Sequence, residues 1–435
     1  MPRRNLLLIV IVAIVSAVCF RQADSAHRSE YGQMYDTFTE VLKKVDQDYL
    51  REVDNRVLFE GALQGMVSKL DPYSAYIGPK QFPDLKSTLE QKFDGLGIRI
   101  GKEEGSDLPI VISPMADSPA FLAGVRAGDS ILQINGTPTA GVAVDKIVER
   151  LREQTDGAVR LTVRHKGEAG PVELSVERAS FAVPVVLGDS RGPDNQWSFL
   201  LDGHKDIGYL RITSFGQHTD EELRKALEWL RERKVRGVIL DLRNNGGGML
   251  SKSIEVCNLF LKEGRIVSTR GRQGVEKEVF NASGAAEYAN LPLVILVNQY
   301  TASASEIVAA CLQDHKRAII IGQRSWGKGT VQNVIELEHG RSGLKLTTAS
   351  YWRPSGRDIH RHEDNKQQTD WGVQPDAGYE VKLTDEETQE LAKARDQRDV
   401  VRAGGTPAAE ADDPSSTPDP QLAKALEALQ SLLAK

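Results

Sequence analysis

Cysteine is scarce in this 435-residue chain, and Cys19, Cys257 and Cys311 form no CxxC or Cys/His array. The spacing typical of a structural zinc site is therefore missing. Basic residues are not in excess, because 55 Lys and Arg stand against 61 Asp and Glu, a net charge of −6 without a basic stripe. That balance argues against nucleic acid as a partner. There is no GxxxxGK[ST] phosphate loop, and no internal repeat at a period of about 20–50 residues.

Long apolar runs are also rare, and the one that stands out extends from Leu6 to Phe20, 15 residues with Ser16 as the single interruption. A spanning helix needs about 20 residues, whereas a short apolar run after Arg3-Arg4 is typical of an export signal. Residues 1–26 are therefore predicted to be a signal peptide or an N-terminal membrane anchor. We expect an exported protein, in the bacterial periplasm or at the extracytoplasmic face of the inner membrane. The sequence does not decide between removal of this segment by signal peptidase and its retention as an anchor.

Residues 27–91 are predicted to be helical, with apolar residues recurring three and four positions apart. These are Tyr35, Phe38, Val41, Leu42 and Val45, then Val57, Leu58, Ala62, Leu63, Met66 and Leu70. Asp71-Pro-Tyr-Ser74 breaks the pattern as a turn. No titratable residues of obvious use cluster here, so packing, or formation of a homodimer, is the expected role.

Residues 92–179 combine short strands with two helices and resemble a PDZ domain. The resemblance rests on Gly95-Leu-Gly-Ile98, which opens a strand, and on Gly128-Asp129 followed by the Asn135-Gly136 turn. It implies that backbone N–H groups of Gly95, Leu96, Gly97 and Ile98 bind a peptide's C-terminal carboxylate, while the next strand pairs with the peptide. It also implies that Arg126 senses the bound peptide. The alternative is that these glycines only serve turns.

Residues 180–402 are predicted to form an α/β domain, because apolar strand segments alternate with helical patterns. The strands are expected at 207–212, 235–240, 291–297, 318–321 and 344–350, and the helices at 219–232, 250–262 and 304–315. Residues 403–435 form a predicted tail. Its first part, to residue 420, is rich in Ala, Gly, Pro, Ser and Asp and should be a flexible linker. A short helix is expected from Gln421 to Lys435.

Ser303 lies where the apolar segment 291–297 gives way to a helical pattern. A serine at a helix N-terminus is close to backbone N–H groups and to the positive end of the helix dipole. Such a place can hold a nucleophile and stabilise an oxyanion. Ser303-Ala-Ser-Glu306 is also a good capping box, and taken alone it favours a cap over a nucleophile.

Two further stretches carry the other parts of an acyl-transfer site. Lys328 stands between Gly327 and Gly329, four residues before Gln332, which could aim its amine. A lysine acts as a base only when neutral, so its pKa must fall from about 10.4 toward about 7–8. Burial against apolar surface such as Trp326 could lower it. A lone Gly-Lys-Gly, however, is usually a surface turn.

The third stretch, Asp241-Leu-Arg-Asn-Asn-Gly-Gly-Gly248, follows an apolar strand. Its glycines let backbone N–H groups approach a ligand without obstruction by Cβ. The N–H groups of Gly247 and Ala304 could then bind an oxyanion, although a glycine run can also cradle phosphate. The histidines offer no competing triad. His360-Arg-His362-Glu-Asp364 could bind a metal, but a solvated loop is the favoured interpretation, and no metal or cofactor is expected.

Together these motifs resemble the carboxyl-terminal processing proteases, the tail-specific serine proteases with a PDZ domain. The intervals of 25 residues from Ser303 to Lys328 and of 4 from Lys328 to Gln332 agree with that family. The resemblance implies a multidomain α+β protein: a helical N-terminal segment, a PDZ domain and an α/β protease core resembling the crotonase-like βαβ spiral. It also implies Ser303 as nucleophile, Lys328 as base, Gln332 as its orienter, and Gly247 and Ala304 as oxyanion donors. Asp314, 11 residues after the serine, is a secondary catalytic candidate.

The leading hypothesis is an exported serine endopeptidase that cuts protein or peptide substrates near loosely structured C-termini, with the PDZ domain capturing the tail and gating activity. The rivals are a non-catalytic PDZ-bearing scaffold on a decayed protease fold and a crotonase-type acyl-CoA enzyme. A polar insert from His360 to Asp370 departs from the family pattern, and the tail after residue 403 lies outside the resemblance.

Overall fold

The structure is a computed structural model that describes residues 15–16, 30–102, 105–152, 157–192, 194–362, 369–401 and 417–434. The chain divides into two compact units. One comprises Met1–Gly78 with Val334–Leu346, and the other comprises Pro79–Asn333 with Thr347–Lys435. The expected leader lies largely outside the described residues. Among the helices that are described, none is both long and apolar enough to cross a membrane.

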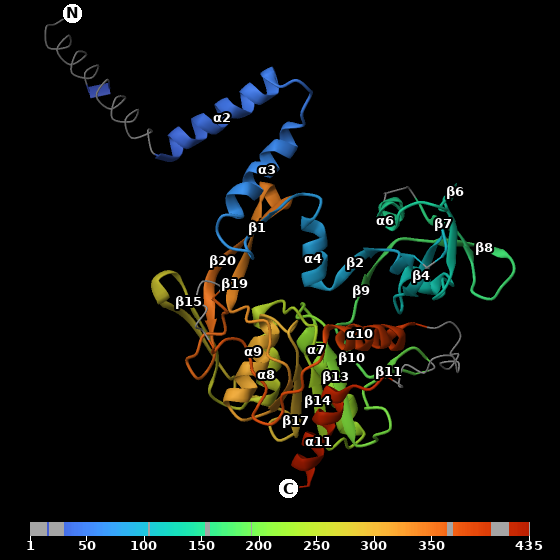
Figure 1. Cartoon of the computed structure of the whole chain (residues 1–435), viewed down its shortest axis with the longest axis vertical. Coiled ribbons are helices and arrows are strands. Elements are labelled where there is room, and N and C mark those ends of the chain that lie inside the picture. Colours follow the sequence, from blue (N-terminus) through green and yellow to red (C-terminus); the bar gives the residue numbers. More distant parts are fainter. Residues whose placement is uncertain are drawn as a thin grey trace, which may run out of the picture. The chain divides into compact units, whose positions relative to one another are not determined.

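The first unit contains α2 (Glu30–Asp48), α3 (Asn55–Val67) and β1 (Ala75–Ile77), so the prediction of helices before residue 70 is confirmed (Figure 1). Asp54 caps α3 by accepting from the Arg56 amide at 2.8 Å. The predicted turn at Asp71 is held by its own carboxylate, which accepts from the amides of Tyr73 and Ser74. The two helices expose apolar side chains on their outer surface: Tyr31, Met34, Tyr35, Val41, Val57 and Met66.

The PDZ-like module is a sheet in the order β3-β4-β5-β7-β8, with β6 paired to β5. The strands are β3 (Ile98–Lys102), β4 (Pro109–Pro114), β5 (Ser130–Ile134), β6 (Thr137–Pro138), β7 (Val159–Arg164) and β8 (Pro171–Val176). Two helices, α5 (Pro119–Leu122) and α6 (Val144–Arg152), complete it. Val111, Ile131, Ile147 and Leu161 are fully buried at its centre. The module is preceded by α4 (Phe82–Glu90) and β2 (Lys92–Gly95), which pairs with β9 (Ala179–Ala182).

The α/β core is built on a second sheet, β10-β13-β14-β17-β18. Its strands are β10 (Val186–Leu187), β13 (Ile207–Ile212), β14 (Gly237–Asp241), β17 (Leu293–Val297) and β18 (Ile319–Gly322). The last four are parallel. Every residue of β14 and β17 is buried, because helices cover both faces of the sheet, and this explains why these strands are continuous apolar runs in the sequence.

One face of this sheet is covered by α7 (Thr219–Glu232), α8 (Leu250–Phe260) and α9 (Ala304–Asp314), which confirms the three predicted helices. The other face packs against α11 (Pro420–Leu433), whose Ala425 and Leu429 are fully buried against Ile239, Val294 and Leu296 (Figure 1). The helix expected at the end of the chain is therefore present, and it is a structural layer of the core. Residues 402–416, most of the predicted linker, lie outside the described residues.

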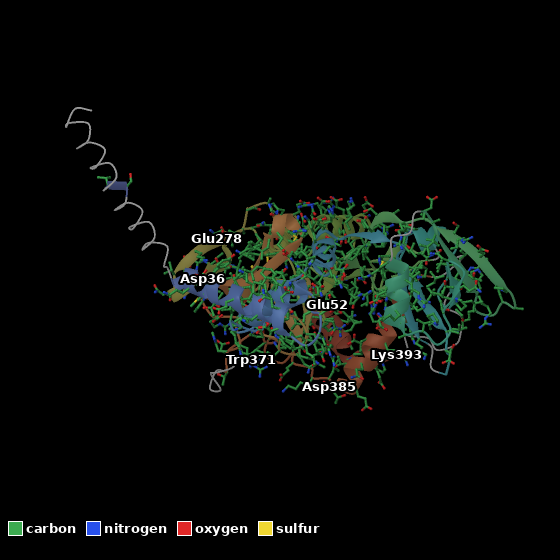
Figure 2. All side chains as sticks on the ribbon, turned by 90° about the horizontal axis from the view of Figure 1, so that it is seen from above. Asp36, Glu52, Glu278, Trp371, Asp385 and Lys393 are labelled. Atoms are coloured by element: carbon green, nitrogen blue, oxygen red, sulfur yellow. The ribbon has the colours of Figure 1, made fainter. Side chains whose placement is uncertain are left out.

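The remaining elements belong to neither of these two sheets. They are β11 (Ser190–Arg191), β12 (Trp197–Ser198), β15 (Arg265–Arg270), β16 (Glu276–Asn281), β19 (Thr330–Leu337), β20 (Ser342–Trp352), α10 (Asp385–Asp399) and two 3-10 turns, Arg272–Gly274 and Glu338–Gly340. In the second unit β15 pairs with β16 and with the end of β20, where Thr269 lies opposite Tyr351. Helix α10 keeps Asp385 and Lys393 exposed (Figure 2).

Candidate active site

Ser303 is the N-cap of α9 and has φ 58° and ψ −118°, a backbone conformation that a non-glycine residue rarely adopts. The turn before it is fixed by Thr301, whose hydroxyl accepts from the Asn298 amide at 2.9 Å and donates to the Leu242 carbonyl at 2.8 Å. Ser303 itself is 6% exposed. The predicted position at a strand-to-helix junction is confirmed, and the strained serine at a helix N-terminus is suited to a nucleophile.

The capping box is also present, but its glutamate does more than cap. Glu306 is fully buried, and one carboxylate oxygen accepts from both the Ser303 amide at 2.8 Å and the Lys328 amide at 2.9 Å. Its other oxygen accepts from the Ser325 hydroxyl at 2.5 Å and the Gly327 amide at 2.7 Å. Burial raises the pKa of this carboxyl, and the four donors oppose the rise. Glu306 therefore links the backbone of the candidate nucleophile Ser303 to that of the candidate base Lys328.

The glycines beside Lys328 are required by close packing. A Cβ on Gly329 would lie 2.3 Å from the His360 amide nitrogen, and one on Gly327, where φ is +83°, would lie 2.8 Å from the Trp371 ring. The Arg361 amide also donates to the Gly327 carbonyl at 2.9 Å. The start of the polar insert is thus packed against the Lys328 segment. Lys328 is half-buried, and Trp326 beside it in the sequence is 49% exposed.

The loop after β14 lies directly against the serine. A Cβ on Gly247 would be 2.7 Å from the Ser303 Cβ and 2.9 Å from the Ala304 nitrogen, so only glycine fits, and its φ is +100°. Both predicted oxyanion donors are therefore beside Ser303. In this structure, however, the Gly247 N–H donates to the Asn245 Oδ1 at 2.8 Å. Asn245 is fully buried, and its carbonyl accepts from the Ala302 amide and the Ser305 hydroxyl.

Tyr351 is a site residue that the sequence analysis missed. It is 4% exposed, its amide donates to the Gly329 carbonyl at 2.7 Å, and its hydroxyl lies beside the Ser303 side chain. Burial raises the pKa of Tyr351 to about 12, so the phenol stays protonated at neutral pH. Gln332 lies on β19, where its amide nitrogen donates to the hydroxyls of Thr330 and Thr347 at 2.8 and 3.2 Å.

Asp314 is not brought to the site. It is the last residue of α9, about 16 Å along the helix from Ser303 at 1.5 Å per residue. Its carboxylate accepts from the Arg353 guanidinium at 2.6 and 3.0 Å and from the Ser355 amide at 3.0 Å. Burial opposes its charge, but Arg353 outweighs burial and lowers the pKa of Asp314. These contacts give Asp314 a structural role, and its catalytic role stays a prediction.

In the PDZ-like module, Gly95 ends β2 and Ile98 begins β3, which is an outer strand of its sheet with α6 beside it. Gly97 has φ +73°, and a Cβ there would overlap the Ser118 side chain. The Leu96 side chain belongs to the buried core. The loop and strand edge thus have the form that peptide binding needs. Arg126 is directed elsewhere in this structure, to Glu168 at 2.8 Å.

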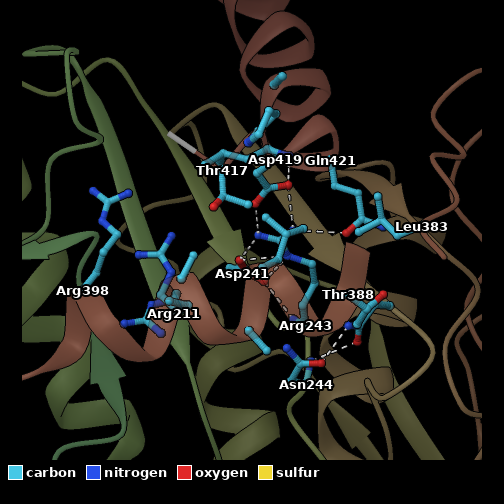
Figure 3. A pocket seen from close by; sticks show the side chains of 18 of the residues that line it. Arg211, Asp241, Arg243, Asn244, Leu383, Thr388, Arg398, Thr417, Asp419 and Gln421 are labelled. Carbon is cyan, nitrogen blue, oxygen red and sulfur yellow. Dashed lines mark hydrogen bonds and ion pairs between the residues drawn. The ribbon is translucent and has the colours of Figure 1, made fainter. Parts of the chain in front are cut away.

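A buried charged network surrounds Arg243, the second residue after β14. Its guanidinium pairs with Asp241 at 2.7 Å and with Asp419 of α11 at 2.9 Å (Figure 3). Burial opposes the charge on Asp241, but Arg243 outweighs it and lowers the pKa of Asp241. These residues line a cavity of about 640 Å³ between α10, α11 and the ends of β13 and β14, and Ser303 is not part of its lining.

The two cysteines of the core and the histidines of the polar insert are both described by the structure. Cys257 and Cys311 are buried on the adjacent helices α8 and α9 and are not bonded to each other as a disulfide. The rings of His360 and His362 stack edge to face, with centroids 4.8 Å apart, whereas Glu363 and Asp364 lie outside the described residues. Within the described ranges, no group of three or more His, Cys, Asp or Glu residues is placed to hold a metal ion.

An α/β core with a serine at a helix N-terminus, a glycine loop against it and an attached PDZ-like module defines a class of serine proteases. Residues 206–379 match peptidase family S41, residues 85–164 match the PDZ domain, and residues 15–80 match the activating protease CtpB N-terminal domain. The chain is 35% identical over 378 residues to the carboxy-terminal-processing protease of Bartonella bacilliformis, covering 83% of this chain and 81% of that protein.

It is also 33% identical over 328 residues to the carboxy-terminal processing protease CtpA of Bacillus subtilis, covering 75% and 67% of the two chains. A solved putative S41 protease from Bacteroides fragilis shares the fold, with a TM-score of 0.51 at 18% identity, covering 88% of this chain and 92% of that one. The chain belongs to peptidase family S41, the carboxy-terminal processing serine proteases. Its PDZ domain implies that the substrates are protein C-termini.

Proposed function

We propose that this protein is an exported endopeptidase that works through a Ser303–Lys328 dyad and trims proteins near loosely structured C-termini. The observation that carries the proposal is the single Glu306 oxygen that accepts from the amides of both residues. A serine needs a neighbouring base, and this carboxylate ties the two backbone segments to one oxygen. Gln332 is the proposed orienter of the Lys328 amine.

In the proposed reaction, neutral Lys328 takes the proton of the Ser303 hydroxyl as Oγ attacks the substrate carbonyl. The oxyanion is bound by the N–H groups of Ala304 and Gly247, the first of which also benefits from the helix dipole. The lysine then gives its proton to the leaving amine, and water hydrolyses the acyl-enzyme by the same route. The Gly247 N–H must turn from Asn245 to the substrate for this step, so productive binding includes a local rearrangement of the glycine loop.

The PDZ domain is proposed to present the substrate. A C-terminal carboxylate would bind the N–H groups of Gly95, Leu96, Gly97 and Ile98, and the peptide would pair with the outer edge of β3. Capture of the tail in this way would gate activity. Arg126 is a weaker candidate contact, since it would first have to leave Glu168.

The predicted export signal supports a location in the bacterial periplasm or at the extracytoplasmic face of the inner membrane, with residues 1–26 as signal or anchor. The exposed apolar side chains of α2 and α3, among them Tyr35 and Met66, support a homodimer formed by this unit. The test is sedimentation of the chain from residue 27 onward. Dimers that become monomers in the Tyr35→Asp/Met66→Asp variant support the proposal, and an unchanged dimer would refute this surface.

The dyad is tested by cleavage of an unstructured protein with a free C-terminal tail. We expect Ser303→Ala and Lys328→Ala each to abolish cleavage, while Ser251→Ala, an exposed serine on α8, leaves it unchanged. Wild-type activity should rise with pH as the lysine loses its proton. Undiminished cleavage by Ser303→Ala would rule out the nucleophile. Retained binding of the tail with no cleavage by the wild type would favour the scaffold instead.

A further inference from the structure

We infer that the C-terminal helix α11 is a positioning element for the proteolytic site, acting through the Asp419–Arg243 ion pair on the glycine loop. The S41 match ends at residue 379, so α11 lies outside the segment that defines the family here. The inference rests on the proposed oxyanion role of Gly247. It concerns how that loop is held, not which residue attacks.

The contact is bidentate and largely buried. Two guanidinium nitrogens of Arg243 donate to the two Asp419 oxygens at 3.0 and 2.9 Å, and Nη1 also donates to the Gln421 Oε1 at 3.1 Å (Figure 3). The Arg243 side chain is 11% exposed and that of Asp419 is 15% exposed. Such planar, two-point pairing fixes direction as well as distance.

Helix α11 is itself held firmly in place. Gln421 is fully buried and donates to the Val381 carbonyl at 2.9 Å. Leu429 packs so closely on β14 that a Cβ on Gly237 would lie 2.8 Å from it. Asp419 also caps the helix by accepting from the Leu422 amide at 2.9 Å. The helix therefore gives Arg243 a second carboxylate partner beside Asp241, and this partner comes from an element far along the chain from the loop.

The other end of the connection reaches the nucleophile within a few residues. Arg243 precedes Asn244 and Asn245, and the Asn244 amide and side chain form a reciprocal pair with the Asn298 side chain, both bonds at 2.9 Å. The Asn245 carbonyl accepts from the Ala302 amide at 2.9 Å. A shift of Arg243 is thus passed to both sides of the Gly247–Ser303 contact. Misplacement by about 1 Å can cost a hundredfold in rate.

The test compares Asp419→Asn with Glu427→Gln in the chain from residue 27 onward. Asparagine caps a helix about as well as aspartate, so this change removes the carboxylate charge that faces Arg243 while keeping the cap. Glu427 is a matched control, because it lies on the same helix, is exposed and pairs with Lys424. We expect Asp419→Asn to lower kcat about tenfold or more with KM within twofold, and Glu427→Gln to change neither.

A peptide boronate gives a second readout, since its tetrahedral adduct with the serine needs the oxyanion donors whereas binding of the unmodified product peptide does not. We expect Asp419→Asn to weaken boronate inhibition about tenfold and to leave product inhibition unchanged. Asp419→Glu should restore most of both values. Assays are run well below the unfolding temperature of each variant, which is measured alongside.

An unchanged kcat and unchanged boronate inhibition in Asp419→Asn would overturn the inference, even if the variant unfolds at a lower temperature, because α11 would then be only structural. The proposed function fails by a different result. If Ser303→Ala still cleaves, or if the boronate does not inhibit the wild type, the assumed site is wrong whatever Asp419 does.

Discussion

The amide of Lys328 donates to the Glu306 carboxylate at 2.9 Å, although 22 residues separate them in the sequence. The oxygen concerned also accepts from the Ser303 amide, so a glutamate that caps a helix also fixes the distance between the candidate nucleophile and base. A buried carboxylate with four donors is tolerated because each donor compensates part of its desolvation.

This relationship predicts the effect of Glu306→Gln. Each Glu306 oxygen accepts two hydrogen bonds, and in glutamine one of these oxygens is replaced by an NH₂ group, which cannot accept. At least one of the donors therefore loses its partner. We expect kcat to fall about 10–100-fold, with an unfolding free energy about 1–3 kcal/mol lower. Kinetics and thermal unfolding check this, with Glu255→Gln on the exposed side of α8 as the control. Full activity in Glu306→Gln would contradict the positioning role.

Adjacent glycines of the loop after β14 should respond very differently to alanine. Gly247 has φ +100°, and its Cβ would press on Ser303, so Gly247→Ala is expected to lower kcat/KM at least a hundredfold. A Cβ on Gly246 meets nothing within 4 Å and its φ is not in the left-handed region, so Gly246→Ala should keep most of the activity. An equal loss of kcat/KM in the two variants would show that the close contact of Gly247 with Ser303 is not the cause of the loss.

Tyr351→Phe removes the hydroxyl that lies beside the Ser303 side chain while leaving the ring in place. We expect kcat to fall about tenfold with little change in KM, because one serine rotamer is no longer favoured. With its pKa raised to about 12, the phenol does not titrate near neutrality, so the shape of the pH–rate profile should not change. Tyr288→Phe is the matched control, because the buried Tyr288 hydroxyl has no hydrogen-bond partner among the described residues. A tenfold loss in both variants would argue against a specific role.

Asp314 should matter for stability and not for catalysis. Its pKa is lowered in the folded protein, so the stabilisation is present above the unfolded value of about 3.9 and is lost as the pH falls through the lower folded value. Asp314→Asn is therefore expected to cost roughly 3 kcal/mol of unfolding free energy at pH 7, since it leaves the buried Arg353 without a carboxylate. The difference from wild type should shrink toward pH 3. A pH-independent difference, or a large loss of kcat in stable protein, would refute this interpretation.

The sequence by itself determined the order of domains and most elements of the core. Strands such as 293–297 are unbroken apolar runs because both of their faces are covered. The start of α9 is predicted by the capping box that Ser303 and Glu306 form. These are local signals, carried by neighbouring residues. The intervals between Ser303, Lys328 and Gln332 likewise identified the family resemblance from the sequence alone.

The tertiary structure decided what depends on distant pairs. No local pattern shows that the Glu306 carboxylate accepts from the Lys328 amide, or that the Tyr351 side chain lies beside Ser303. Nor does one show that Asp314 forms an ion pair with Arg353. The position of Glu306, a charged residue within the apolar helix 304–312, was the only sequence signal for its contact with Lys328. The tail shows the same limit most clearly. Composition and period predicted a helix at its end, but only packing shows that α11 completes the sheet and holds Arg243 through Asp419.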